Sequence, residues 1–307
     1  MNEYTYQDYL AVKKSVDDRA LNRRVFETFR THLCKIQEQG TARLIEIGSG
    51  AGAMVERLFD RDVLHRYDYT AMDLNQDNTS AAISGIQHYC EKHGIEYAVS
   101  DGQIFKLLED EKRGHIRFVT ADALEWLQEE EHIAGFDGIL AHAVLDLFHL
   151  ETAVPILLQA LKPGGFYYFT LNYGGVTQVS PSENPRLNKK ILDTYHKSMN
   201  SETTNGKPRS GSKAAAKLEA ILSDKTTLIA SGDSPWRVEP VNGGYPDDEH
   251  RFIEYLLRTM ENALKSVPEI GEKELTDWLA ERREHLSTGR LQFTALNKDF
   301  FGVYETS

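Results

Sequence analysis

The segment LIEIGSGAGAMVERL, residues 44–58, restricts the possible folds of this chain more than any other stretch. An apolar run stops at three closely spaced glycines, Gly48, Gly50 and Gly52, and an apolar pattern of helical period follows. Glycines let the backbone turn sharply and approach a ligand, and a helix that begins there offers free N–H groups. The segment therefore predicts a buried strand, a tight bend and a helix, with a ligand site at the bend.

Strand and helix patterns alternate over residues 42–174. Further strands are predicted at YDYTAMDLN, HIRFVTAD, GFDGILAHA and FYYFTLNYG, and a helix over Gln76–His93 is predicted to end at Gly94. Ahead of the bend, an apolar stripe predicts a helix over residues 17–37, with Asp17 and Asp18 available as its N-cap. This alternation is typical of a mostly parallel sheet covered by helices on both faces.

The charge and cysteine content restrict the class of partner. Acidic residues outnumber basic ones 47 to 35, for a formal net charge of −12, which argues against nucleic acid or an anionic membrane as a partner. The two cysteines, Cys34 and Cys90, have no Cys or His neighbour at metal-ligand spacing, and no stretch has the length of a membrane span. We expect a cytoplasmic protein that needs no metal.

An acid, Glu46, lies inside the apolar run just before the glycines. A carboxylate at this bend would repel a pyrophosphate but would suit a ligand that bears an ammonium and a sulfonium group. The residues EIGSGAG, with Glu46, Gly48, Gly50 and Gly52, resemble the first motif of class I S-adenosylmethionine-dependent methyltransferases, E/D-x-G-x-G-x-G. A simpler interpretation, in which Glu46 pairs with a buried arginine, stays open.

The resemblance continues in the family's order over about residues 42–174. Asp73 ends the second strand, where the family places an acid on the ribose hydroxyls, and Asp122 matches the acid that meets the adenine amino group. Either aspartate could instead cap a helix. The cofactor-binding residues that the resemblance implies are Glu46, Gly48, Ser49, Gly50, Gly52, Asp73, Leu74, Asp122, Ala123 and His142.

The resemblance implies an α/β fold of the Rossmann-like, doubly wound type: a mostly parallel seven-stranded sheet whose last strand is antiparallel, with helical cap insertions. We expect an N-terminal helical segment or lid over residues 1–40 and a cofactor-binding core over 41–175. Insertions that form a substrate cap, together with the sixth strand, would occupy 176–290, and a final strand over 291–307 would complete the sheet. The polar stretch at 200–213 predicts a loop.

Two other classes of protein share parts of this pattern. An NAD(P)-dependent oxidoreductase of the short-chain type would need a Tyr-x-x-x-Lys pair after the fourth or fifth strand, but Tyr9 and Lys13 show that spacing ahead of the bend. A non-catalytic regulatory protein that binds S-adenosylmethionine would keep the same motifs. The function predicted here is methyl transfer from S-adenosylmethionine to a small molecule by in-line displacement.

The acceptor and its base should lie near the end of the fourth strand. In ILAHAVLDLFH, His142 is the candidate base, because an imidazole titrates near neutral pH. Tyr4, Tyr6 and Tyr9 could form a lid over the site. The candidate acceptor-binding residues are Tyr9, Asp146, Tyr173, Trp236 and Arg237. The pattern leaves open which atom is methylated and whether the protein is a monomer or a homodimer.

Overall fold

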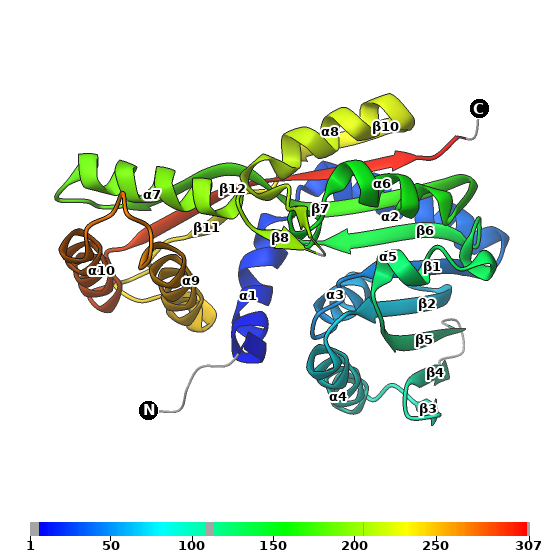
Figure 1. Cartoon of the computed structure of the whole chain (residues 1–307). Coiled ribbons are helices and arrows are strands. Elements are labelled where there is room, and N and C mark those ends of the chain that lie inside the picture. The colour runs from blue at the N-terminus through cyan, green and yellow to red at the C-terminus, as the bar shows by residue number, and fades with distance from the viewer. Residues whose placement is uncertain (1–5, 109–112, 205, 306–307) are drawn as a thin grey trace.

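A computed structural model describes residues 6–108, 113–204 and 206–305, so Tyr4 lies outside the described residues. Its centre is a mixed sheet of ten strands in which nine form the order β10-β12-β7-β6-β1-β2-β5-β4-β3, and β11 pairs with β12 (Figure 1). A separate two-stranded hairpin joins β8 and β9. The strands are β1 (Ala42–Ile47), β2 (Arg66–Asp73), β3 (Tyr97–Ser100), β4 (Ile104–Leu108), β5 (Arg113–Thr120), β6 (Phe136–His142), β7 (Leu161–Ser180), β8 (Thr203–Thr204), β9 (Lys207–Pro208), β10 (Thr227–Asp233), β11 (Trp236–Val238) and β12 (Gln292–Val303).

Seven of these strands form the expected core, which confirms the predicted fold class. β1 pairs in parallel with β2 and β6, β2 with β5, and β6 with β7. The last strand, β12, runs antiparallel between β7 and β10. Beyond this core, the β3–β4 hairpin extends the sheet edge at β5, and it was not predicted because β3 is largely exposed and shows no alternating apolar pattern.

Helices cover both faces of the sheet. They are α1 (Tyr6–Ala20), α2 (Arg23–Gln39), α3 (Ala53–Asp60), α4 (Gln76–His93), α5 (Ala123–Trp126), α6 (Leu150–Gln159), α7 (Pro185–Met199), α8 (Ala214–Lys225), α9 (Glu249–Leu264) and α10 (Glu272–Ser287), with short 3-10 turns η1 (Glu130–His132), η2 (Leu145–Leu147), η3 (Gly211–Lys213) and η4 (Pro246–Asp248). Side chains of α2, α3 and α4 pack in one apolar cluster, and those of α5, α6 and α8 pack in another. Leu44 of β1 belongs to the first cluster and Ile45 to the second, because neighbouring side chains of a strand point to opposite faces of the sheet.

The helix expected over residues 17–37 is two helices that meet at residues 21–22. The side chain of Asn22 accepts a hydrogen bond from the N–H of Val25 at 3.1 Å and so caps α2, while its own N–H donates to Oδ2 of Asp299 at 2.8 Å. The prediction that Asp17 and Asp18 cap this helix was wrong, because both lie in the last turn of α1. The two carboxylates are therefore available for contacts with the sheet and α3.

A third apolar cluster builds the cap. It joins α1, α7, α9 and α10 to the far parts of β7 and β12, and Figure 1 shows α7, α9 and α10 grouped at one end of the molecule. β7 is a single strand of 20 residues that continues past residue 175, so the sheet itself extends into the cap. The segment expected as a loop over 200–213 contains the β8–β9 hairpin and η3.

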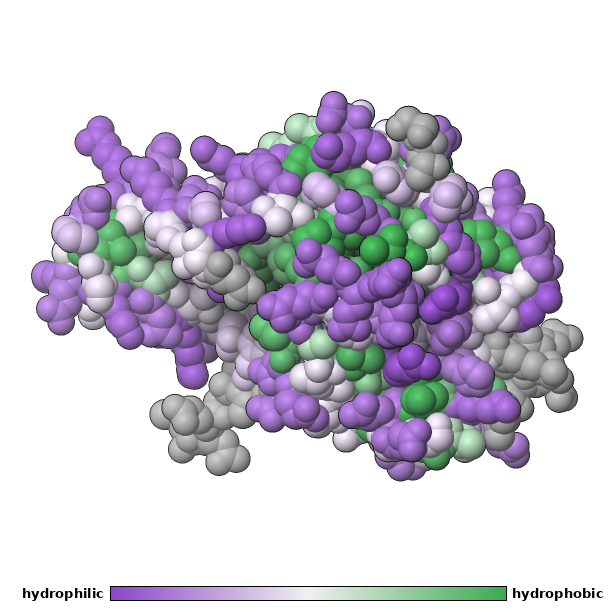
Figure 2. All heavy atoms as spheres, turned by 45° about the vertical axis from the view of Figure 1, so that its right-hand side comes forward, coloured by the Kyte–Doolittle hydropathy of each residue, from purple (hydrophilic) through white to green (hydrophobic). Residues whose placement is uncertain are grey.

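The face of the molecule seen in Figure 2 is mostly hydrophilic, with hydrophobic side chains gathered near its centre. No helix of the described residues combines the length and the apolar character that crossing a membrane requires.

Candidate functional site

A cavity of about 920 Å³ lies at the carboxyl ends of the parallel strands, where open α/β sheets bind ligands. It collects most of the residues that the sequence singled out. The predicted residues that line it are Glu46, Gly48, Ser49, Gly50, Asp73, Leu74, Asp122, Ala123, His142, Tyr9, Asp146, Tyr173 and Trp236. Gly52 and Arg237 are not among its lining residues.

The glycine bend forms one wall of the cavity. Gly48 has a φ of +68°, and a Cβ atom on it would lie 2.5 Å from Cγ2 of Val144, so only glycine fits there without strain. The N–H of Gly50 donates to Oδ2 of Asp73 at 2.9 Å, which ties the bend to the end of β2. Gly52 has a φ of +87° and forms the N-cap of α3, so its role is in the turn itself.

Asp73 is held rigidly at the end of β2. Its Oδ1 accepts hydrogen bonds from the N–H of Asn75 at 2.9 Å and from the amide of Asn78 at 3.1 Å. Each carboxylate oxygen has two acceptor sites, so these bonds fix the group without saturating it. The next residue, Leu74, is 70% exposed although it is apolar, and it borders the cavity.

Asp122 caps a helix and lines the cavity as well. Its Oδ1 accepts from the N–H groups of Leu124 at 2.9 Å and Glu125 at 3.2 Å, at the start of α5. The capping role that the sequence left open is therefore observed. Ala123 follows it in the cavity wall.

Glu46 is an almost fully buried acid, with 1% of its surface exposed. Burial raises its pKa to about 7, against the lowering effects of the hydrogen bond from Tyr69 and the charge of Arg57. The Tyr69 hydroxyl donates to Oε2 at 2.9 Å. Arg57 is also buried, but its Nε bonds to Asp18 and its Nη1 to the sulfur of Met54. The arginine influences Glu46 through charge, without a direct ion pair.

His142 stands at the end of β6 with both ring nitrogens engaged. Nδ1 lies 2.6 Å from Oγ1 of Thr170, and Nε2 lies 3.1 Å from Oδ2 of Asp17. Burial and the nearby Arg57 guanidinium lower the pKa of the imidazole to about 4, although Asp17 opposes this shift. His142 is therefore neutral at neutral pH.

Asp17, which was predicted as a helix cap, is the centre of this cluster. The indole N–H of Trp236 donates to its Oδ1 at 2.8 Å, and Nζ of Lys13 lies 2.5 Å from its Oδ2. Burial alone would raise the pKa of the Asp17 carboxyl, but the charge of Lys13, the hydrogen bond with His142 and the charge of Arg57 hold it far below its usual range. The i, i+4 spacing of Lys13 and Asp17 is a signal of a helical pair that could have placed both residues within one helix.

The cap closes the cavity with aromatic side chains. The ring of Tyr9 stacks on that of Tyr255 with centroids 4.0 Å apart, and the hydroxyl of Tyr173 lies 2.7 Å from Oγ1 of Thr177.

Asp146 lies in η2 and is partly buried at the cavity wall. Arg237 is exposed on β11, next to Trp236, because neighbours on a strand face opposite sides.

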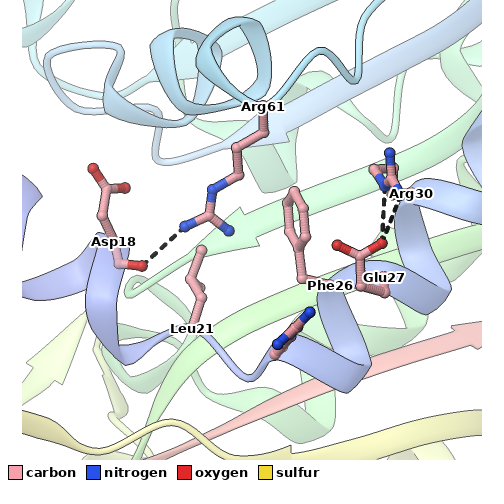
Figure 3. A pocket seen from close by; sticks show the side chains of 7 residues that line it. Asp18, Leu21, Phe26, Glu27, Arg30 and Arg61 are labelled. Carbon is pink, nitrogen blue, oxygen red and sulfur yellow. Dashed lines mark hydrogen bonds and ion pairs between the residues drawn. The ribbon is translucent and has the colours of Figure 1, made fainter.

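Two other features lie outside this cavity. A surface pocket of about 510 Å³ between α1, α2 and α3 holds Arg61, whose guanidinium lies 4.5 Å from the ring of Phe26 and donates to the Asp18 carbonyl at 2.9 Å (Figure 3). Arg30 pairs there with Glu27 at 2.8 Å. Near η1, Glu129, Glu131 and His132 bring donor atoms within 4.8 Å of one another.

No protein-family model and no curated protein matches this chain. Solved structures with similar folds include phosphoethanolamine N-methyltransferase 2 of Haemonchus contortus in complex with S-adenosyl-L-methionine, at 15% identity and a TM-score of 0.43 over 100% of this chain and 58% of that one. A SAM-dependent methyltransferase of Methanosarcina mazei aligns at 12% identity and 0.45, over 87% and 94% of the two chains. An arsenic(III) S-adenosylmethionine methyltransferase of Chlamydomonas reinhardtii aligns at 12% and 0.40, over 85% and 63%.

The seven core strands, the antiparallel last strand and the glycine bend at the end of β1 give this chain a Rossmann-like α/β fold.

Proposed function

We propose that this protein is a methyltransferase that binds S-adenosylmethionine and methylates a small molecule. The observation that carries the proposal is the charge of the cavity wall at the ends of β1, β2 and β5. Glu46, Asp73 and Asp122 line this part, whereas the Lys and Arg residues that line the cavity, Lys13, Lys207 and Arg209, come from α1 and from the segment around β9. A dinucleotide would place its pyrophosphate against these carboxylates, which would repel it. The sulfonium and ammonium groups of S-adenosylmethionine are cationic, so the same carboxylates would attract them.

The shapes and donors of this wall fit S-adenosylmethionine. The side-chain-free bend at Gly48 and Gly50 lets the backbone approach the amino-acid end, and Asp73 presents acceptor oxygens suited to a vicinal diol. Leu74 exposes apolar surface that a nucleobase would cover. Asp122 would accept a hydrogen bond from the adenine amino group.

Bound S-adenosylmethionine supplies an electrophilic methyl group, and the chain's own residues align the acceptor and exclude water. The sequence suggested His142 as the base. Because both of its nitrogens are in short contacts, we propose instead that it positions Asp17, and with it the α1 wall of the cavity. A proton from the acceptor would then leave through another group.

Isothermal titration tests the proposal. We expect S-adenosylhomocysteine to bind the wild-type protein and NAD to show no heat of binding. Asp73→Asn should weaken S-adenosylhomocysteine about tenfold or more, because it removes one charged acceptor, and the exposed control Asp224→Asn should leave the affinity unchanged. Binding of NAD in place of the nucleoside would refute the proposal. Binding without any turnover of acceptors would support the non-catalytic alternative.

A further inference from the structure

The cavity extends beyond the proposed cofactor wall into a region lined from the cap. We call this region the acceptor chamber and define it by the lining residues Tyr6, Tyr9, Asp146, Tyr173, Tyr195, Trp236 and Tyr255. A volume of about 920 Å³ is near the upper end of the roughly 300–1,000 Å³ that ligand pockets occupy, so the cavity has room for a second small molecule.

Aromatic rings dominate the chamber. Tyr9 and Tyr255 stack at 4.0 Å, and Tyr6 lies 5.9 Å from Tyr9 and 6.3 Å from Tyr255, measured between ring centroids. The ring of Trp236 makes a cation–π contact with Lys13, whose Nζ lies 5.1 Å from the ring centroid. Aromatic faces attract cations through their quadrupole, and the attraction grows where water is excluded. The chamber wall therefore favours a cationic or amine group over an anionic one.

Two of the three Lys and Arg side chains that line the cavity are paired with carboxylates. Lys13 is paired with Asp17, and the guanidinium of Arg209 forms an ion pair with Glu202. Lys207 is exposed, and its Nζ lies 3.3 Å from the hydroxyl of Thr152. To pair with Lys13 or Arg209, an anionic acceptor would have to displace a carboxylate, and only the exposed Lys207 has no carboxylate partner among the described residues.

Asp146 differs from these groups. Within the residues that the structure describes, no side chain forms a hydrogen bond or ion pair with its carboxylate. It follows β6 by four residues, in η2, and so stands beside the strand end that carries His142. Burial raises the pKa of its carboxyl, with Lys13 and Arg209 acting in the opposite direction. The carboxylate has a backbone hydrogen bond within its own residue but no side-chain partner, so in an aromatic chamber it is a site for an N–H donor.

We propose that the methyl acceptor is a small amine whose nitrogen donates a hydrogen bond to Asp146. This inference rests on the proposed function. In the transfer, the lone pair of the neutral amine forms a bond to the methyl carbon, and the carbon–sulfur bond breaks with its electron pair remaining on sulfur. The nitrogen then loses a proton to Asp146, from which it passes to solvent. The raised pKa of the carboxyl makes it a better proton acceptor than an exposed aspartate.

The test compares compounds that share a carbon skeleton and differ in one group. Phenethylamine, N-methylphenethylamine, 2-phenylethanol and phenylacetate, and the corresponding butyl series, are titrated into the wild-type protein with and without saturating S-adenosylhomocysteine. Asp146→Asn keeps the size of the side chain and removes its charge, and the exposed Asp224→Asn is the matched control. Thermal melts establish that each variant is folded.

We expect the amines to bind at least about tenfold more tightly than their alcohols or acids, and Asp146→Asn to abolish this preference while leaving S-adenosylhomocysteine binding unchanged. The comparison of amine with alcohol in the wild-type protein needs no variant and decides the question even if Asp146→Asn does not fold. Tighter binding of the alcohol or the acid, or no binding of any amine, would overturn the inference. If S-adenosylhomocysteine did not bind the wild-type protein, the proposed function would be overturned, irrespective of the affinities measured for the amines.

Discussion

Substitution of Gly48 by alanine gives a quantitative test of the glycine bend. Two separate costs are expected at this position. A φ of +68° places a non-glycine residue in the left-handed region, which costs about 1–2 kcal/mol. The added Cβ would also lie 2.5 Å from Cγ2 of Val144, and overpacking of this kind costs about 1–3 kcal/mol. Gly48→Ala should therefore lower the free energy of unfolding by about 2–5 kcal/mol.

Gly94 provides a matched control elsewhere in the fold. It also has a φ of +68°, at the C-cap of α4, but a Cβ atom there would meet no heavy atom within 4 Å. Gly94→Ala should show the backbone cost alone, about 1–2 kcal/mol. The difference between the two variants isolates the clash with Val144, and Val144→Ala in the Gly48→Ala background should recover part of it.

Urea denaturation, followed by tryptophan fluorescence and by circular dichroism, measures these free energies where the two transitions coincide. Titration with S-adenosylhomocysteine measures the effect on the site. We expect Gly48→Ala to weaken this ligand, since the bend must shift, and Gly94→Ala to leave its affinity unchanged. Equal losses of stability in the two variants would refute the close contact between the bend and Val144.

Two further substitutions test buried acids. The folded-state pKa of Glu46 lies above its ordinary value of 4.5, at about 7, so the stability that its bound proton contributes is complete below pH 4.5 and is lost as pH rises through about 7. Thermal melts between pH 5 and 8 should show the wild-type protein losing stability relative to Glu46→Gln, and parallel curves would contradict this. Asp299 accepts hydrogen bonds from the N–H groups of Asn22 and Leu171, both at 2.8 Å, and from Ser234 at 2.5 Å. Asp299→Ala leaves these buried donors unpaired and should cost roughly 3 kcal/mol or more in urea denaturation, whereas the exposed Asp224→Asn should change stability by less than about 0.5 kcal/mol.

The sequence predicted the core sheet and the glycine bend because both depend on local pattern. Apolar runs alternate with helical stripes, and a strand that ends in glycines and an acid leaves few other structures open. The positions of Asp73 and Asp122 also followed, since strand ends in a parallel sheet share one edge. The positions of these two residues could be predicted without knowledge of contacts between distant parts of the chain.

The wall contributed by α1 could not be predicted in this way. Asp17 enters the site because α1 packs against α3, α9 and β11, and the break at Asn22 depends on Asp299, almost at the other end of the chain. Arg237 is a different case, because its exposure could have been anticipated. A strand that turns Trp236 toward the cavity must turn the next side chain away.

The lengths of β7 and β12 limit how this protein could be altered. Tyr173 and Thr177 of β7, and Phe293, Ala295 and Asn297 of β12, border the cavity on strands that also pair deep in the core. A chimera that exchanged the cap for another would have to cut both strands at mid-length and would lose ladder hydrogen bonds on either side of the cut. New acceptor specificities are therefore reached more readily by single side-chain changes along these two strands than by grafting a foreign module.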